Sequence, residues 1–158
     1  MLCALHIDEF DRQNIILSDK TKNNVLQKGD FYRIYYSDED CCFNGVFIYF
    51  NLQNVVIEPY FNKIKCTFSK NLNKKNIHRL KLLEKEILVG LNLNKKPVYR
   101  IEEQLIQNFI KVFDDININN GISLDNINVY LKIAGIWSNE DQYGITFRFF
   151  FIHPLETM

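Results

Sequence analysis

The strongest constraint on the fold is a regular alternation of side chains near the end of the chain. Residues 129–137 and 143–151 place mostly apolar side chains at every second position, and the polar stretch Ser138-Asn139-Glu140-Asp141 lies between them. A period of two is typical of β-strands with one face buried. Because the turn is short, the two segments are predicted to form a long β-hairpin, with strands near ten residues each.

The first half of the chain also favours strands. Apolar, β-branched or aromatic runs occupy residues 2–7, 14–17, 30–36, 45–51, 54–58 and 61–68. In the last of these runs, Lys63 and Lys65 belong to one face, whereas Ile64, Cys66 and Phe68 belong to the other. The runs at 45–51 and 54–58 are joined by a short polar link, which predicts a further hairpin.

Helical spacing appears between these strands and the C-terminal hairpin. Ile77, Leu80, Leu83, Ile87 and Leu88 recur at the period of an amphipathic helix, and a glycine at position 90 is a natural stop. A second helix is predicted after residue 97, where apolar residues follow at 101, 105, 109 and 112. Residues 114–126 are rich in Asn and Asp, which predicts a loop.

Strands, then helices, then a closing hairpin is close to the element order of an OB-fold. The predicted fold class is therefore β-rich α+β, an OB-fold-like barrel of about five to seven strands with two helices inserted before a C-terminal β-hairpin. In that fold the helix is expected between the third and fourth barrel strands. Residues 1–158 are predicted to form a single domain, because no linker or repeat divides them. An unrelated α+β sandwich with the same element order remains an alternative.

The net charge of the chain is zero, but its charges are segregated. Residues 1–60 carry 5 basic and 9 acidic side chains, residues 61–101 carry 11 and 2, and residues 102–158 carry 3 and 8. The local balances are therefore −4, +9 and −5. A basic block of this size creates a positive potential on one part of a fold whatever the total charge is.

Composition and the start of the chain restrict the class of protein. The chain is 47% hydrophobic and 14% aromatic, which excludes intrinsic disorder. No apolar run approaches the roughly 20 residues of a membrane span, and the early Asp8, Glu9 and Asp11 predict that there is no secretory signal. The 4 cysteines form no CxxC pair. They therefore predict reduced thiols in an intracellular protein, cytoplasmic or nuclear.

A basic segment flanked by aromatic residues favours single-stranded nucleic acid as the partner, because such binders combine a basic groove with stacking rings. The predicted phosphate contacts are Lys63, Lys65, Lys70, Lys74, Lys75, Arg79 and Lys81. The predicted stacking residues are Tyr60, Phe61, Phe68, Trp137 and Tyr143. Two alternatives stay open: the lysines form a solvated helix face, and the Trp137 and Tyr143 rings fill the barrel.

The hairpin carries a more specific pattern. It reads Gly135-Ile136-Trp137, an acidic turn, and then Tyr143-Gly144-Ile145-Thr146-Phe147-Arg148. Over roughly 20 residues this resembles the C-terminal hairpin of single-stranded-DNA-binding proteins of large DNA viruses. The resemblance implies an OB-fold barrel that coats single-stranded DNA during viral replication or recombination, in an infected host cell. By resemblance, Trp137, Tyr143, Gly144 and Arg148 would belong to the binding site. Arg148 is also the one charged residue in an apolar strand, so it is expected to face either solvent or a phosphate.

Patterns of catalysis and cofactor binding are missing from the sequence. His6, His78 and His153 lack the spacing of a metal site, and the chain has no phosphate-binding GxxxxGK[ST] or GxGxxG loop and no GxSxG nucleophile. We therefore expect a protein that is not an enzyme, with no catalytic residues, no metal and no cofactor.

Two function classes remain. The first is a non-sequence-specific single-stranded nucleic-acid-binding protein, most consistent with single-stranded DNA. The alternative is a viral structural or assembly protein that self-associates through strands and complementary charge, since the acidic and basic segments could pair between copies. A homo-oligomer is possible under both hypotheses, and no membrane partner is expected.

Overall fold

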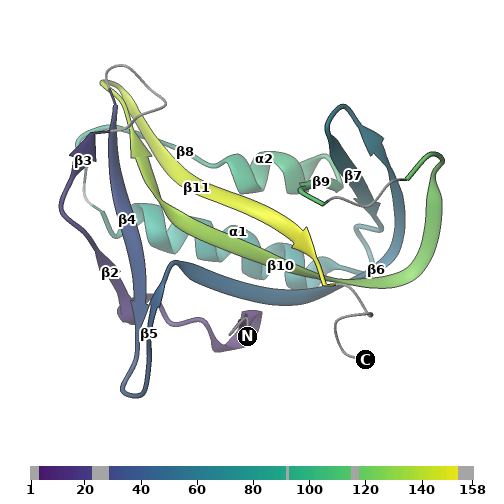
Figure 1. Ribbon diagram of the computed structural model, residues 1–158, viewed down its shortest axis with the longest axis horizontal. Coiled ribbons are helices and arrows are strands. Elements are labelled where there is room, and N and C mark those ends of the chain that lie inside the picture. Colours follow the sequence, from purple (N-terminus) through teal and green to yellow (C-terminus); the bar gives the residue numbers. More distant parts are fainter. Residues whose placement is uncertain (1–3, 23–28, 92, 115–117, 153–158) are drawn as a thin grey trace.

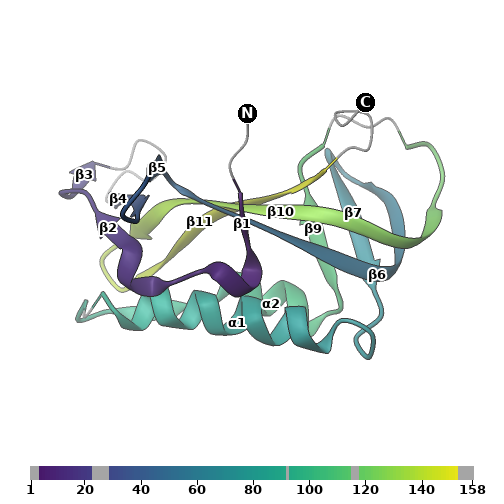
Figure 2. The same ribbon diagram turned by 90° about the horizontal axis from the view of Figure 1, so that it is seen from below.

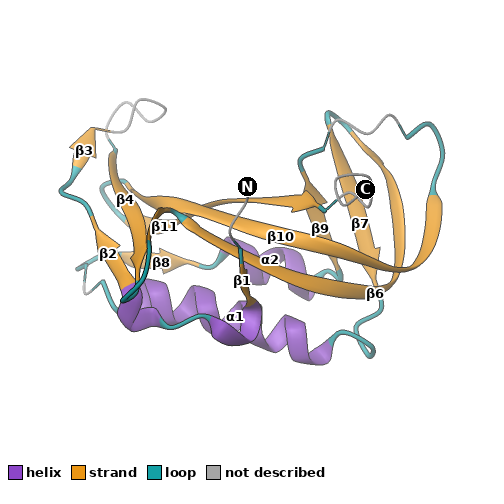
Figure 3. Ribbon diagram, turned by 60° about the horizontal axis from the view of Figure 1, so that its bottom comes forward, coloured by secondary structure: helices purple, strands orange, loops and turns teal. Residues whose placement is uncertain are grey.

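The computed structural model describes residues 4–22, 29–91, 93–114 and 118–152. Its elements before the first helix are β1 (Leu5–His6), the 3-10 turns η1 (Ile7–Glu9) and η2 (Arg12–Asn14), β2 (Ile15–Leu17), β3 (Thr21–Lys22), β4 (Asp30–Ser37), β5 (Cys42–Asn44), β6 (Val46–Tyr60) and β7 (Lys63–Phe68). They are followed by α1 (Lys74–Val89), β8 (Lys96–Val98), α2 (Arg100–Ile106), β9 (Phe109–Val112), β10 (Ile122–Ser138) and β11 (Gln142–Phe151). Strands form one side of the molecule, and α1 and α2 lie together on the other (Figures 1 and 3).

Five of the described strands close a barrel. β6 pairs with β7, β7 with β9, β11 with β10 and β10 with β6, all antiparallel, whereas β9 and β11 are parallel. Numbered along the chain, the barrel strands close in the order one, two, three, five, four. This is the five-stranded Greek-key arrangement of an OB-fold, so the predicted OB-fold-like class is confirmed.

The position of the helices differs from the expectation. Both α1 and α2 lie between β7 and β9, the second and third barrel strands, rather than between the third and fourth. They run side by side beneath the barrel (Figure 2). The predicted stripe of α1 is confirmed: Ile77, Leu80, Leu83, Ile87 and Leu88 are all buried. Gly90 ends the helix as its C-cap residue.

The second helix is much shorter than its apolar spacing predicts. α2 ends at Ile106, and Asn108 then adopts a positive φ of 62°, a conformation that Asn tolerates better than most residues. Phe109–Val112 becomes the strand β9. The predicted loop over residues 114–126 is also too long, because β10 begins at Ile122 and pairs at once with Ile57 of β6.

The hairpin of β10 and β11 connects the barrel to the remaining strands of the sheet. β10 pairs with β6 up to Ile133 and then, past an irregularity at residue 134, pairs with β4 through Gly135–Ser138. β4 in turn carries β2, β3 and β5, which extend the sheet beyond the barrel (Figure 1). The buried apolar side chains of the described residues form one continuous cluster inside the barrel and against α1 and α2.

Candidate functional site

The barrel wall has a gap between β8 and β9. β8 pairs with β11 as far as Gly144, and β9 meets β11 only at Phe149. Among the described residues, Ile145–Arg148 therefore have no strand partner on this edge of β11. α2 spans the gap, since it connects β8 to β9. The wall between β8 and β9 therefore has an opening, and polar side chains can line it.

A groove of about 290 Å³ lies at this gap, and we call it the basic groove. Its lining residues are Lys63, Arg100, Gln104, Lys111, Phe113, Trp137, Ile145, Thr146, Phe147, Arg148 and Phe149. A second hollow of about 190 Å³ adjoins it and shares Arg100, Gln104 and Lys111. Side chains from β7, α2, β9 and β11 therefore converge on one surface, although they are far apart in the sequence.

Each cation of this surface lies over an aromatic ring. Lys63 Nζ is 4.4 Å and the Arg148 guanidinium carbon 4.9 Å from the centre of the Phe113 ring. The other pairs are Lys65 over Phe109 at 4.8 Å, Lys111 over Tyr60 at 5.5 Å and Arg100 over Trp137 at 4.7 Å. Cation–π contacts of this kind hold the charged groups at the surface without neutralising them.

Two of these lysines face each other directly. Lys65 of β7 is the cross-strand partner of Lys111 of β9. Like charges in such positions destabilise a sheet, because their Cβ atoms are only about 5 Å apart. The Lys65 Nζ also lies 3.9 Å from a carboxylate oxygen of Glu58, which offsets part of this repulsion. The surface nevertheless has an excess of positive charge.

α2 is held in place by a buried carboxylate. Glu84 of α1 is fully buried and accepts hydrogen bonds from the backbone N–H groups of Ile101 (2.9 Å) and Glu102 (3.0 Å). Burial raises the pKa of Glu84 to about 7, although both hydrogen bonds favour the charged form. Because Arg100 and Gln104 belong to the same short helix, this contact fixes their position at the basic groove.

A second contact ties α2 to β9. The Gln104 side-chain oxygen accepts a hydrogen bond of 2.9 Å from the Lys111 backbone N–H. The first contact attaches α2 to α1 and the second attaches it to the barrel wall. The cations at positions 100 and 111 are consequently carried by elements that are fixed relative to each other.

Trp137 has a supporting position in this arrangement. Its ring is 8% exposed and packs against Gly144, where a Cβ atom would lie only 2.8 Å from the indole. Arg100 covers the ring from the groove. Trp137 therefore lines the basic groove and supports the Arg100 side chain from below. Its ring is not accessible to a stacking partner.

The structure brings some of the predicted site residues together. Lys63, Lys65 and Arg148 all lie at the basic groove or its rim, together with Tyr60. Phe61, in the turn between β6 and β7, is 93% exposed and packs edge-on against Tyr60 at 5.0 Å. These five residues form one surface with the cations of α2 and β9.

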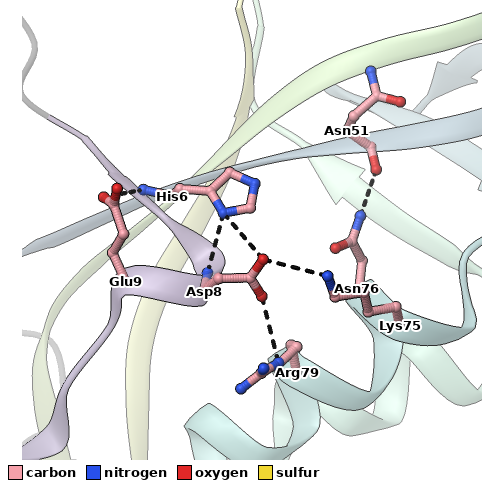
Figure 4. A network of polar contacts seen from close by, with 7 residues as sticks. All are labelled: His6, Asp8, Glu9, Asn51, Lys75, Asn76 and Arg79. Carbon is pink, nitrogen blue, oxygen red and sulfur yellow. Dashed lines mark hydrogen bonds and ion pairs between the residues drawn. The ribbon is translucent and has the colours of Figure 1, made fainter.

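The predicted lysines and arginine in and just before α1 lie elsewhere. Lys75 and Arg79 face the N-terminal turn η1, where Lys75 Nζ is 3.4 Å and Arg79 Nε 3.5 Å from the Asp8 carboxylate (Figure 4). Lys70 and Lys74 are exposed and Lys81 is half-buried, and none of the three lines either hollow. The predicted phosphate contacts after Lys65 therefore lie apart from the basic groove, because the chain turns away from it where β7 ends.

Two predicted stacking residues belong to the core. Phe68 is only 4% exposed on the inner face of β7. Tyr143 is also 4% exposed, and its hydroxyl donates a hydrogen bond of 3.0 Å to the Leu88 carbonyl oxygen of α1. Burial raises the pKa of Tyr143. Both rings are needed for packing and are not accessible to a base, so their assignment as stacking residues is corrected here.

Sequence reasoning missed Arg100, Gln104, Phe109, Lys111 and Phe113. Arg100 is part of the basic block, but nothing in the sequence separates it from the other cations there. The other signal was the alternation of Phe109, Lys111 and Phe113, which has the period of a strand. Phe109 and Phe113 also fit the apolar stripe of a helix that continues beyond residue 106, and that interpretation concealed the site.

In comparisons with known proteins, no family model, curated protein or solved structure matches the chain. Within the described residues, no helix has the length and apolar character needed to cross a membrane. The same residues contain no group of three or more His, Cys, Asp or Glu side chains arranged to hold a metal ion.

Proposed function

We propose that this protein binds single-stranded DNA, the nucleic acid that the hairpin resemblance implies, without sequence preference and at the basic groove. The observation that supports this most directly is the set of cations over aromatic rings on β7, β9, β11 and α2. In an OB-fold the face formed by the second and third strands is the usual oligonucleotide surface. Those strands are β7 and β9 in this chain.

The chemistry of the groove suits a flexible polyanion. Lys63, Lys111 and Arg148 would contact phosphates, and each of the three lies over an aromatic ring at this surface. The cross-strand repulsion between Lys65 and Lys111 would be relieved by a phosphate placed between them. Phosphate contacts of this kind provide most of the sequence-independent affinity of nucleic-acid-binding proteins.

The exposed rings suit unpaired bases. Phe61 is exposed in the turn between β6 and β7, the first and second barrel strands, and Tyr60 lies beside it. Stacking of a base on an aromatic side chain contributes about 1–3 kcal/mol and does not depend on the base. A duplex hides the faces of its bases, so this surface favours a single strand.

The proposal is tested by titrating a fluorescent oligothymidylate with the protein in about 50 mM salt. We expect the variant Lys63→Gln/Lys111→Gln to bind at least about tenfold more weakly than the wild type, because two phosphate contacts are lost. The matched control is Lys74→Gln/Lys85→Gln, which removes the same charge from exposed positions on α1. Undetectable binding by the wild type, or equal losses in both variants, would contradict the proposal.

A further inference from the structure

A second surface of the barrel has the same chemistry and was not part of any sequence expectation. It lies on the outer face of β6, β10 and β11 and consists of Phe47, Tyr49, Tyr130, Lys132 and Phe150, which we call the outer platform. The strand register places these residues in two neighbouring rows. Tyr49, Tyr130 and Phe150 are cross-strand partners in one row, and Phe47, Lys132 and Arg148 are partners in the other.

Two rings of the first row, those of Tyr130 and Phe150, lie against each other. Tyr130 and Phe150 are stacked, with ring centres 4.9 Å apart and an angle of 17° between the planes. Tyr49 is 38% exposed, and the His6 ring packs edge-on against it at 5.1 Å. A line of aromatic rings thus crosses the outer wall of the barrel at right angles to its strands. Base stacking needs flat apolar faces of this kind, whichever base is present.

The second row is positively charged, and this charge destabilises the sheet. Lys132 and Arg148 are direct cross-strand partners, so their like charges repel. Each is drawn toward a different ring, Lys132 to Phe47 at 5.7 Å and Arg148 to Phe113 at 4.9 Å. None of the outward side chains of the two rows carries a negative charge. A phosphate lying between the two cations would relieve this repulsion.

Arg148 makes the two surfaces continuous. Its guanidinium lies over Phe113, and Lys63 lies over the same ring. The second row therefore runs from Phe47 through Lys132 and Arg148 into the basic groove without interruption. A self-association face would not need cations opposite each other, whereas a polyanion would neutralise them. The charge pattern and the continuity with the groove thus favour the same ligand on both surfaces.

We propose that the outer platform is a second stacking site for the same single strand, which leaves the basic groove past Arg148 and crosses the faces of β11, β10 and β6. This inference rests on the proposed function of the groove. It makes a distinct prediction about length: a short oligonucleotide fills the groove alone, and only a longer one reaches the platform. Single barrels of this kind cover about 4–16 nucleotides, which includes both cases.

The test compares oligothymidylates of about 4 and about 12 nucleotides. The platform variant Tyr49→Thr/Lys132→Gln keeps β-compatible residues and is expected to bind the longer strand about tenfold more weakly, with unchanged affinity for the shorter one. The control Tyr35→Thr/Lys85→Gln removes the same groups from β4 and α1 and should match the wild type for both lengths. The groove variant Lys63→Gln/Lys111→Gln should lose affinity for both.

The outcomes separate the two proposals. If the platform variant binds the longer strand like the wild type while the groove variant is impaired, the platform is refuted and the proposed function stands. If wild-type protein binds neither length, the proposed function fails, and the platform proposal fails with it. A platform variant that changes only the sedimentation of the free protein would show that the rings join two copies, which also overturns the proposal.

A measurement on the wild-type protein removes the dependence on how well the variants fold. A longer oligothymidylate carrying one photoreactive 5-iodouracil is crosslinked at each position in turn, and the modified peptides are sequenced. We expect some positions to crosslink to Tyr49 or Tyr130 and others to Tyr60 or Phe61. Crosslinks confined to the groove residues would overturn the platform.

Discussion

Glu84 shows how one residue makes the stability of the protein depend on pH. Its pKa is raised from 4.5 to about 7 in the folded state because the carboxylate is buried. A group with a raised folded pKa contributes its full stabilisation below the unfolded pKa and loses it as the pH rises through the folded value. The window of loss therefore extends from about pH 4.5 to about pH 7, and the total is on the order of 3 kcal/mol.

Replacing Glu84 by Gln should remove this dependence. The variant loses one of the two acceptors for the Ile101 and Glu102 N–H groups, but it has no proton to exchange. We expect its free energy of unfolding to rise relative to the wild type between about pH 5 and pH 8, whatever the offset at the lower pH. Urea unfolding of both proteins across this range measures the difference. Glu86→Gln, at an exposed position of the same helix, is the control, and a flat difference for Glu84→Gln would contradict the prediction.

The cysteines should differ sharply in reactivity. Burial raises the pKa of Cys66 to about 12, and its side chain points into the barrel from β7. Cys41 and Cys42 are exposed at the tip of the β4–β5 hairpin. Because the thiolate is the nucleophile, iodoacetamide near pH 8 should alkylate Cys41 and Cys42 and leave Cys66 intact until the protein is unfolded. Mass spectrometry of the peptides distinguishes the sites, and rapid labelling of Cys66 in native protein would refute the prediction.

Among the elements, β10 depends on a glycine where it changes partner. Gly135 begins the pairing with β4, and a Cβ atom there would lie 2.4 Å from both the Tyr32 carbonyl oxygen and the Phe31 ring. Gly135→Ala must push the two strands apart, so we expect a loss of about 1–3 kcal/mol in unfolding free energy. At Gly121 the nearest atom is 3.9 Å away, and Gly121→Ala should cause no comparable loss. Equal stability of the two variants in urea would argue against this account.

The same scale shows how far the sequence predicts elements. The C-terminal hairpin and α1 are predictable because each has a single period: alternation in 129–137 and 143–151, and helical spacing from Ile77 to Leu88. The segment after Arg100 has apolar residues that fit both periods. There the helix ends at Ile106 because Phe109–Val112 completes the barrel between β7 and β11. That choice depends on tertiary pairing, which no local pattern contains.

For the whole molecule, the barrel class could be predicted but the site only in part. Lys63 and Lys65 were predicted from charge and Arg148 from the hairpin resemblance. Arg100 and Lys111 come close to them only when β9 and β11 close the barrel. Conversely, Lys75 and Arg79 are close to Lys65 in sequence, but they form ion pairs with Asp8 on the side of α1 that faces η1. Charge segregation along the chain therefore indicated the presence of a basic surface and not its members.

The salt dependence of binding tests this distinction between local and summed charge. For single strands the slope of log K against log salt concentration is about −0.7 per phosphate contact. The cations over aromatic rings at the groove are Lys63, Lys65, Arg100, Lys111 and Arg148, so we expect a slope of about −3 to −4, although the net charge of the chain is zero.

Two single variants make the test specific. Lys111→Gln should make the slope shallower by about 0.7, because one phosphate contact is lost. Lys75→Gln removes the same charge from a residue that contacts Asp8 outside the groove, and it should leave the slope unchanged. Fluorescence titrations with one oligothymidylate at several salt concentrations measure both. If the two variants change the slope equally, binding follows the overall charge of the protein, and the groove is not where the phosphates lie.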